Sequence, residues 1–394
     1  MSNTVPNDWE AASLRELCKF SGGSAFKEKY QGRRRGEYPF IKVSDMTIDG
    51  NQRFITNANH WIDQATKIEA KIKLFPASSV VFAKVGAALL LNRRRILTRE
   101  TAIDNNMMAA IPNSDDNNFL YYVLQEVDLR EIVQGGAVPS VNQAQMEDIP
   151  TLIPPLPEQQ KIAAILSSVD NVIEKTRAQI DKLKDLKTGM MQELLTKGIE
   201  RTEFKDSPVG RIPKGWSVQT LGETATLQRG HDLTQANSVM GRYPVVSSSG
   251  VSAMHDEYTT QGPGVVVGRK GSIGRVHYIQ SDFWAHDTSL YVTNFHGNDV
   301  LFIYQLLSWL DLQKYGTKSG SPSLNRNDLH PLKLAIPPVA EQIEIRKVLM
   351  HVYKRTSLLH RKLNHLTGLK KALMQDLLTG KVRANVDQKE PAVA

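Results

Sequence analysis

Basic residues gather in the parts of this chain that carry no helical pattern. Arginine can bind a backbone phosphate or form two parallel hydrogen bonds to the edge of a guanine, so such clusters have the chemistry of a DNA contact. The candidates for contacts of this kind are Arg33, Arg34, Arg35, Lys84, Arg93, Arg94, Arg95, Arg229, His231, Arg269, Lys270 and Arg275. Charged runs in loops are also common on ordinary solvated surfaces, and for any single cluster that interpretation stays open.

A glycine-rich segment, residues 264–274, surrounds Arg269 and Lys270, and residues 80–87 with Lys84 form a weaker counterpart. It is no Walker A loop, because no Gly-Lys-Ser/Thr closes the required spacing, and no dinucleotide fingerprint, because no clear helix opens after it. The pattern predicts a strand and a turn that let the backbone approach something closely. The DNA backbone is one candidate, and tight packing alone is the other.

Motifs for catalysis are missing. An adenine methyltransferase should carry Asn or Asp before Pro-Pro-aromatic, but Ile153 and Ile336 precede the two Pro-Pro pairs. A magnesium-dependent nuclease should show clustered carboxylates with a nearby lysine, and none is found. The histidines lack metal-ligand spacing, and the single cysteine, Cys18, excludes an internal disulfide and a multi-cysteine zinc site. We therefore assign no catalytic residue, no metal and no cofactor to this chain.

The composition is that of an ordinary globular protein. Apolar residues make up 41% and charged residues 23% of the 394 residues, and the formal net charge is +8. A positive balance fits a polyanionic partner, although many basic proteins bind none. The first residues lack the pattern of a signal peptide, and the apolar runs are too short to span a bilayer, so we expect a cytoplasmic protein without a membrane partner.

The elements that must position these residues come from a tandem repeat. When the chain is slid on itself by 183 residues, Pro-Pro at 154–155 falls on Pro-Pro at 337–338, and Met-Gln-Glu-Leu-Leu-Thr at 191–196 falls on 374–379. Pro-Ser-Val-Asn at 139–142 also falls on 322–325. Nearer the N-terminal end of each half the offset changes: Trp9 matches Trp216, which is an offset of 207 residues. The C-terminal part of each copy is therefore constrained in length, and the N-terminal part is variable. This is expected for two domains that recognise different targets and share one framework.

The constrained part of each copy has the pattern of a long helix. Apolar residues alternate steps of four and three, which is a coiled-coil seam, with polar breaks at Thr176, Lys187, Thr356 and Lys370. The apolar seam positions are Ile162, Leu166, Val169, Ile173, Ile180, Leu183, Met190, Leu194, Ile345, Leu349, Val352, Leu359, Leu363, Leu366, Leu373 and Leu377. Gly198 and Gly380 lie where helix stop signals should. An isolated helix of this length is improbable, so we predict that the two copies pair antiparallel.

The variable parts read as mixed α/β. Strand-like runs fall at 39–43, 79–83, 243–247 and 265–267, helical stretches at 119–128 and 302–311, and small-residue loops at 135–140 and 319–323. The expected fold is two α/β (α+β) target-recognition domains, separated by two long helices that form an intramolecular antiparallel coiled coil, with pseudo-two-fold symmetry. The expected boundaries are 1–153 and 200–336 for the recognition domains, 154–199 and 337–383 for the helices, and 384–394 for a flexible tail.

Taken together, these motifs resemble the specificity subunits of type I restriction–modification systems. The resemblance rests on the repeated Ile-Pro-Pro-(Leu/Val)-x-Glu-Gln element, the heptad helix after it, its Met-Gln-x-Leu-Leu-Thr ending, and Gly-Arg-Lys-Gly-Ser-Ile-Gly at 268–274. It implies that each recognition domain reads one half of a split, asymmetric sequence on double-stranded DNA, and that the helices set the spacer. It also implies two modification subunits with the S-adenosylmethionine chemistry, restriction subunits with ATP-driven, magnesium-dependent cleavage, and no activity on this chain.

Two other functions stay open on the residues alone. One is a solitary DNA-binding specificity protein that acts without restriction partners. The other is a coiled-coil adaptor that binds only proteins, in which the helices are a scaffold. A rigid spacer between two similar domains favours a DNA-binding function over a plain scaffold, because such a spacer fixes the separation of two half-sites.

Overall fold

The computed structural model describes residues 6–113, 116–133, 138–317 and 322–386. The chain divides into two units: the first holds Met1–Thr176 and Lys362–Ala394, and the second holds Arg177–Arg361. Both long helices, α6 (Leu156–Lys197) and α10 (Val339–Leu378), contribute a part to each unit. The predicted recognition domains, 1–153 and 200–336, each fall within one unit. The two units are described separately below.

The first unit is built on two sheets and a two-stranded ribbon. The five-stranded sheet has the order β2-β10-β7-β8-β4, the four-stranded sheet has the order β5-β3-β9-β6, and β1 pairs with β11. The strands are β1 (Glu10–Ser13), β2 (Cys18–Gly22), β3 (Tyr38–Ile41), β4 (Phe54–Ile55), β5 (His60–Ile62), β6 (Leu74–Phe75), β7 (Val80–Ala83), β8 (Arg95–Leu97), β9 (Thr101–Ile103), β10 (Met107–Pro112) and β11 (Pro150–Ile153). The helices besides α6 are α1 (Leu14–Leu17), α2 (Gln64–Glu69), α3 (Asn117–Glu126), α4 (Leu129–Ile132) and α5 (Gln143–Glu147).

The second unit repeats this plan with one strand fewer in each sheet and one additional ribbon. Its four-stranded sheet has the order β15-β21-β18-β19, its three-stranded sheet β17-β16-β20, and its ribbons are β14-β22 and β12-β13. The strands are β12 (Phe204–Ser207), β13 (Gly210–Pro213), β14 (Ser217–Thr220), β15 (Thr226–Arg229), β16 (Tyr243–Ser247), β17 (Gly250–His255), β18 (Gly264–Gly268), β19 (Val276–Ile279), β20 (Trp284–Ala285), β21 (Ser289–Asn294) and β22 (Lys333–Ile336). The helices besides α10 are α7 (Leu221–Thr224), α8 (Val300–Trp309) and α9 (Arg326–Leu329).

The two units share one topology. In each, a middle strand (β10 or β21) lies between two antiparallel neighbours, and a second sheet contains one parallel pair, β3 with β9 or β16 with β20. Successive residues of β7 point to opposite faces of the sheet. Val80 and Phe82 therefore pack toward α3 and α6, while Val81 joins the core on the other side. The predicted α/β class and its duplication are confirmed.

The repeated Pro-Pro…Glu-Gln element fastens each long helix to its domain. Asp116 and Asp299 cap α3 and α8 by accepting the backbone N–H of Phe119 and Phe302. The glutamine bridges that cap and the prolines: Gln342 donates to the Pro337 carbonyl at 2.9 Å and accepts from the Asp299 N–H at 3.0 Å. In the first unit Gln159 donates to the Pro154 carbonyl at 3.0 Å. The motif is therefore a joint between the short helix and the long one.

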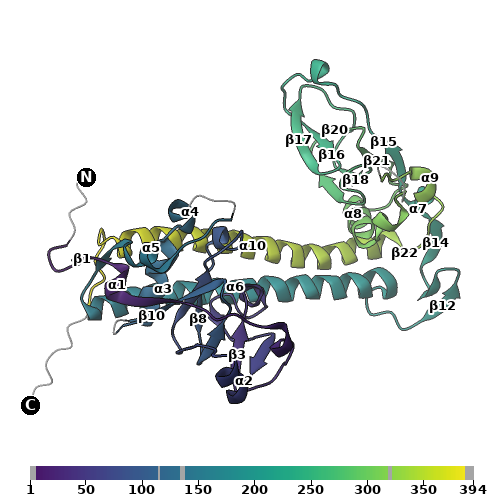
Figure 1. Ribbon diagram of the computed structural model, residues 1–394. Coiled ribbons are helices and arrows are strands. Elements are labelled where there is room, and N and C mark those ends of the chain that lie inside the picture. Colours follow the sequence, from purple (N-terminus) through teal and green to yellow (C-terminus); the bar gives the residue numbers. More distant parts are fainter. Residues whose placement is uncertain (1–5, 114–115, 134–137, 318–321, 387–394) are drawn as a thin grey trace, which may run out of the picture. The chain divides into compact units, whose positions relative to one another are not determined.

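The two long helices pair antiparallel in both units (Figure 1). In the first unit Ile162 and Leu166, early in α6, share one core with Leu377, late in α10, and Asp170 lies 2.8 Å from Lys370. In the second unit Met191 and Leu195, late in α6, share a core with the early α10 residues of the seam. Every predicted seam position is buried or half-buried. The heptad prediction is confirmed.

The ends of the helices agree with the sequence pattern. Gly198 and Gly380 adopt φ of +73° and +71°, the left-handed conformation that ends a helix. Ala384, the first residue of the predicted tail, is buried, and residues 387–394 lie outside the described part of the chain. The predicted loops 135–140 and 319–323 also lie partly outside it. Within the described residues, no helix is both long enough and apolar enough to cross a membrane.

Candidate nucleic-acid interface

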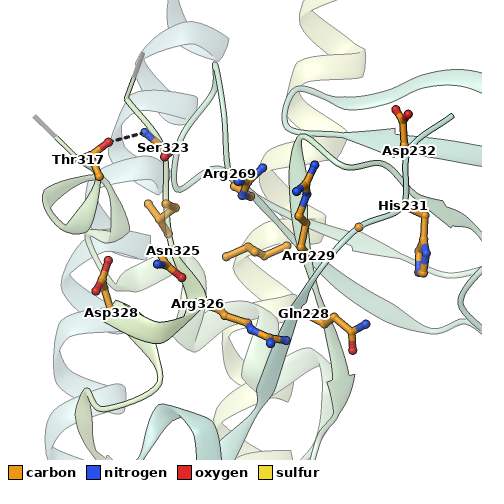
Figure 2. Close-up of a pocket in the computed structure, with 13 residues that line it drawn as sticks. Gln228, Arg229, His231, Asp232, Arg269, Thr317, Ser323, Asn325, Arg326 and Asp328 are labelled. Carbon is orange, nitrogen blue, oxygen red and sulfur yellow. Dashed lines mark hydrogen bonds between the residues drawn. The ribbon is translucent and has the colours of Figure 1, made fainter. Parts of the chain in front are cut away.

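A polar pocket of about 750 Å³ opens on the second unit (Figure 2). It lies where β15 ends, where the chain turns after β18, and where α9 begins. Each of these elements contributes one arginine, and these are Arg229, Arg269 and Arg326. The remaining lining residues are Gln228, Gly230, His231, Asp232, Leu290, Thr317, Ser323, Leu324, Asn325 and Asp328.

Asp287 orients two of the three arginines. Its carboxylate lies 3.0 Å from Nη2 of Arg229, and its backbone carbonyl accepts from Nη1 of Arg269 at 3.2 Å. The Arg229 side chain is 57% exposed, so this ion pair positions the group and adds little stability. His231 Nε2 lies 3.2 Å from the hydroxyl of Tyr291. The guanidinium groups of Arg229 and Arg269 are thus held at the pocket with hydrogen-bonding capacity left for a ligand.

Main-chain hydrogen bonds fix the outline of this pocket. Gly230 donates to the Ser289 carbonyl at 3.0 Å, His231 donates to the Ala285 carbonyl at 2.7 Å, and Leu324 donates to the Arg269 carbonyl at 2.9 Å. Gly230 has to be glycine, since a Cβ there would lie 2.1 Å from the His286 carbonyl oxygen. The frame therefore depends on backbone groups rather than on the side chains that line it.

The first unit contains the same frame. Gly23 donates to the Met107 carbonyl at 3.1 Å, Ser24 donates to the Ile103 carbonyl at 2.9 Å, and Val141 donates to the Lys84 carbonyl at 3.0 Å. A Cβ on Gly23 would lie 2.2 Å from the Asp104 carbonyl oxygen, just as at Gly230. By these bonds Lys84 takes the place of Arg269, and Ser24 that of His231.

The side chains on the two frames differ. Gly22 stands where the second unit has Arg229, directly before the matched glycine. Gln143 stands where the second unit has Arg326, directly after the matched helix cap, and its amide donates to the Phe20 carbonyl at 2.8 Å. The first frame therefore offers one lysine, Lys84, where the second offers three arginines. Two such surfaces can hold two different patterns of acceptors.

The predicted basic residues of the second half gather at this place. Arg229, His231 and Arg269 all line the pocket, and the segment 264–274 forms β18 followed by a turn, as its pattern predicted. Lys270 and Arg275 are exposed on that turn. Gly271 and Gly274 adopt φ of +75° and +73° there, which explains the glycines in conformational terms.

The predicted residues of the first half are dispersed. Arg33 pairs with Asp63 at 2.8 Å, and both side chains are about half exposed. Arg34 and Arg35 are exposed next to it, whereas Lys84 and Arg93 are half-buried. As DNA contacts these residues stay predictions.

Of two further predicted contacts, Arg94 is buried and Arg95 is half-buried. Arg94 is only 2% exposed; its guanidinium lies 5.2 Å from the centre of the Phe82 ring and donates to the Val127 carbonyl at 2.9 Å. Burial lowers the pKa of Arg94 to about 10. The guanidinium of Arg95 donates to the carbonyls of Met46 and Arg94, at 3.0 and 2.7 Å. Both guanidinium groups thus bind carbonyls of their own domain. Burial of Arg94 argues against a contact with DNA, whereas Arg95 stays a prediction.

Other residues of the pocket were not among the predicted contacts. Arg326, Gln228, Asp232 and Asp328 line the pocket without belonging to a basic run. A signal for Arg326 existed, because it directly follows the matched Pro-Ser-Leu-Asn of the repeat. Within the described residues no group of three or more histidine, cysteine, aspartate or glutamate side chains could hold a metal ion.

Each unit also holds one buried carboxylate at the start of a long helix. Glu158 accepts from Trp9 Nε1 at 3.0 Å, from Arg383 Nη2 at 2.7 Å and from the Ala384 N–H at 3.0 Å. In the second unit Glu341 accepts from Trp216 Nε1 at 3.1 Å, from Arg201 Nη2 at 2.7 Å and from the Ile199 N–H at 3.3 Å. In the sequence these glutamates are recognisable only as members of the repeated Ile-Pro-Pro-(Leu/Val)-x-Glu-Gln element.

Two copies of one α/β domain, each joined to a long paired helix and each with the same main-chain frame around a different set of polar side chains, define a duplicated recognition protein. The chain belongs to the family of type I restriction modification DNA specificity domains, whose model matches residues 6–185 and 213–367. Its role is therefore DNA sequence specificity.

Curated relatives and solved structures agree with this family. A putative type I restriction enzyme MjaX specificity subunit of Methanocaldococcus jannaschii is 25% identical, over 96% of this chain and 95% of the relative. The MjaVIII specificity subunit of the same organism is 24% identical, over 96% and 94%. The crystal structure of the S subunit of a type I restriction-modification system from M. genitalium shares the fold, with a TM-score of 0.66 at 15% identity, over 96% of this chain and 97% of that one.

Proposed function

We propose that each recognition domain reads one half of a split, asymmetric DNA sequence. Domain 1–153 reads one half and domain 200–336 reads the other, with the helices 154–199 and 337–383 setting the spacer between them. The observation that carries this proposal is the pair of matching frames, in which Lys84 replaces Arg269 and Gly22 replaces Arg229. A protein with two identical readers would recognise a palindrome, whereas one chain with two unlike readers can recognise an asymmetric site.

In this proposal the chain supplies specificity and other subunits supply chemistry. Two modification subunits bring S-adenosylmethionine and the methylation of adenine, and restriction subunits bring ATP-driven, magnesium-dependent cleavage. The chain itself is non-catalytic, needs no cofactor and works in the cytoplasm. The many polar and cationic groups of the second pocket support a role in binding acceptors on duplex DNA.

The first experiment maps the methylated adenines. The chain is co-expressed with the modification subunits of its own system in a host without adenine methylation, and the genome is sequenced with detection of modified bases. We expect a bipartite motif with two unlike halves and a fixed spacer. A palindromic or an uninterrupted motif would refute the reading of two half-sites.

The spacer role needs a separate test. Inserting one heptad into each helix, at Thr176 and at Leu359, keeps the seam in phase and lengthens each helix by about 10.5 Å. We expect a longer spacer with both half-motifs unchanged. An unaltered spacer would show that the helices do not set it. Inserting seven residues into the exposed 205–211 hairpin, outside both helices, serves as the control and should leave the motif as it is.

A further inference from the structure

Helix α10 carries an unusual concentration of positive charge within the second unit. Residues 345–361 contain five lysine and arginine residues and no aspartate or glutamate. The matching residues of the first repeat, 162–178, contain two acidic and two basic residues and carry no net charge. The two repeats thus keep the same seam positions and differ in the net charge of the other residues of the helix.

Three of these residues and one histidine share one face of α10. Lys347, His351, Lys354 and Arg361 follow one another at helical steps of four, three and seven, so they lie in one row. We call this row the basic stripe. It lies opposite the seam position Thr356, and all four of its side chains are exposed. Its charges therefore point away from the partner helix.

Little within the protein neutralises the basic stripe. Lys347 lies 2.7 Å from Glu344, and both side chains are more than half exposed. In the described part of the chain, Lys354, Arg355 and Arg361 form no ion pair. Beside the row, between α8 and α10, lies a groove of about 290 Å³ lined by Leu301, Arg346, Lys347, Met350, His351 and Lys354. The stripe is thus an open cationic surface.

The repeat shows that the fold does not require this surface. The positions that match Lys347, His351, Lys354 and Arg361 in the first copy are Ala164, Ser168, Asn171 and Ala178. None of these is charged, although the seam residues on the other side of the helix are kept. A surface for two identical subunits would be needed on both repeats, so a stripe present on one repeat serves a partner that is bound once.

We infer that the basic stripe binds the phosphate backbone of duplex DNA, in addition to the contacts made by the recognition domains. This inference rests on the proposed function. The stripe spans about 21 Å along the helix axis at 1.5 Å per residue, which matches about six base-pair steps of 3.4 Å. Lysine and arginine bind phosphate without regard to sequence, so the stripe adds affinity and leaves base discrimination to the recognition domains.

The test uses the full chain with its modification subunits and two duplex probes, one with the mapped recognition site and one with scrambled sequence. Lys347→Gln, Lys354→Gln and Arg361→Gln are combined in one variant. The control combines Arg177→Gln, Lys182→Gln and Lys184→Gln, which removes three exposed positive charges from α6 in the same unit. Affinities are measured by fluorescence anisotropy over a series of salt concentrations.

We expect the stripe variant to bind both probes about tenfold or more weakly at 0.15 M salt, with the ratio between the probes unchanged. The log–log salt slope should flatten by about 0.9 for each lost phosphate contact, and the control should keep the wild-type slope. Equal losses in the stripe variant and the control, or no loss in either, would overturn the inference. Loss of the modification subunits from the stripe variant at unchanged slope would assign the stripe to a protein partner instead. If the wild-type complex failed to distinguish the two probes, the proposed function itself would fail.

Discussion

Glu158 lies at the start of α6, and it binds Arg383, which lies beyond the end of α10, with 2.7 Å between Oε2 and Nη2. In the second unit Glu341 at the start of α10 binds Arg201, beyond the end of α6, also at 2.7 Å. The start of each long helix therefore binds the segment that follows the end of the other long helix. This reciprocal arrangement explains why the glutamate of the repeated motif occurs in both copies.

Replacing these glutamates should destabilise the fold. Glu341 is 7% exposed, and Glu341→Gln keeps its size while weakening charge-assisted hydrogen bonds to Arg201 and Trp216. We expect a loss of about 1–3 kcal/mol in the free energy of unfolding, measured by urea denaturation. Glu344→Gln, an exposed position on the same helix, is the matched control and should change it by less than about 0.5 kcal/mol. Equal losses of unfolding free energy in the two variants would show that the hydrogen bonds of Glu341 do not stabilise the fold.

The same glutamates should make stability depend on acidic pH. Burial acts to raise the pKa of Glu158, but the hydrogen bonds from Arg383, Trp9 and the Ala384 N–H outweigh it and leave the pKa below the ordinary value of 4.5. For Glu341, burial is likewise outweighed by Arg201, the Ile199 N–H and Trp216.

A carboxyl whose folded pKa is lowered stabilises the protein above its unfolded pKa, and this contribution is lost as the pH falls through the folded value. The difference in unfolding free energy between wild type and Glu158→Gln should therefore be full at pH 7 and shrink below pH 4.5. Thermal unfolding of both proteins across that range measures it. A difference that stays constant down to pH 3 would contradict the assigned role of the charge.

One buried group should be dispensable. Gln305 is 6% exposed, and within the described residues its Oε1 has no hydrogen-bond partner. In the repeat it matches Tyr122, whose hydroxyl donates to Asp170 Oδ2 at 2.8 Å. An unsatisfied buried polar atom costs free energy, so Gln305→Met should leave stability unchanged or raise it by up to about 1 kcal/mol. Tyr122→Phe should lower stability by about 1 kcal/mol, and calorimetry of both variants compares the two signs.

The pocket of the second unit and the matching frame of the first should affect different half-sites. Arg269→Ala should cost about 1–3 kcal/mol of discrimination at one half of the target, and Lys84→Ala should act on the other half. Binding to duplexes in which one base pair at a time is changed measures both effects. Arg211→Ala, exposed on β13 outside the pocket, is the control. Loss of discrimination spread over both halves would argue against separate readers.

The sequence was most informative where many residues repeat one physical pattern. The seam of α6 and α10 follows from heptad spacing, because burial at each step constrains the residue type. The ends at Gly198 and Gly380 follow from the left-handed conformation that glycine tolerates. Strands such as β16 and β18 follow from β-branched runs between turns.

Single side chains were harder to place, because their environment is created by distant parts of the chain. Arg94 belongs to an arginine run, and only the packing of Phe82 and Val127 against it shows that it is buried. Glu158 and Arg383 are 225 positions apart in the sequence, so no local pattern joins them. Arg326 stands alone in the sequence and reaches the pocket only because α9 begins beside the turn after β18.

The glycine frame that each unit contains has an evolutionary consequence. Gly23 and Gly230, together with the carbonyls of Lys84 and Arg269, shape the two matching frames through the main chain. A substitution of a side chain on this frame therefore changes the hydrogen-bonding groups that face the DNA and leaves the main-chain hydrogen bonds of the frame intact. One recognition domain can change its half-site while the other domain keeps its own, so a single gene can acquire a new specificity by changing one half-site at a time.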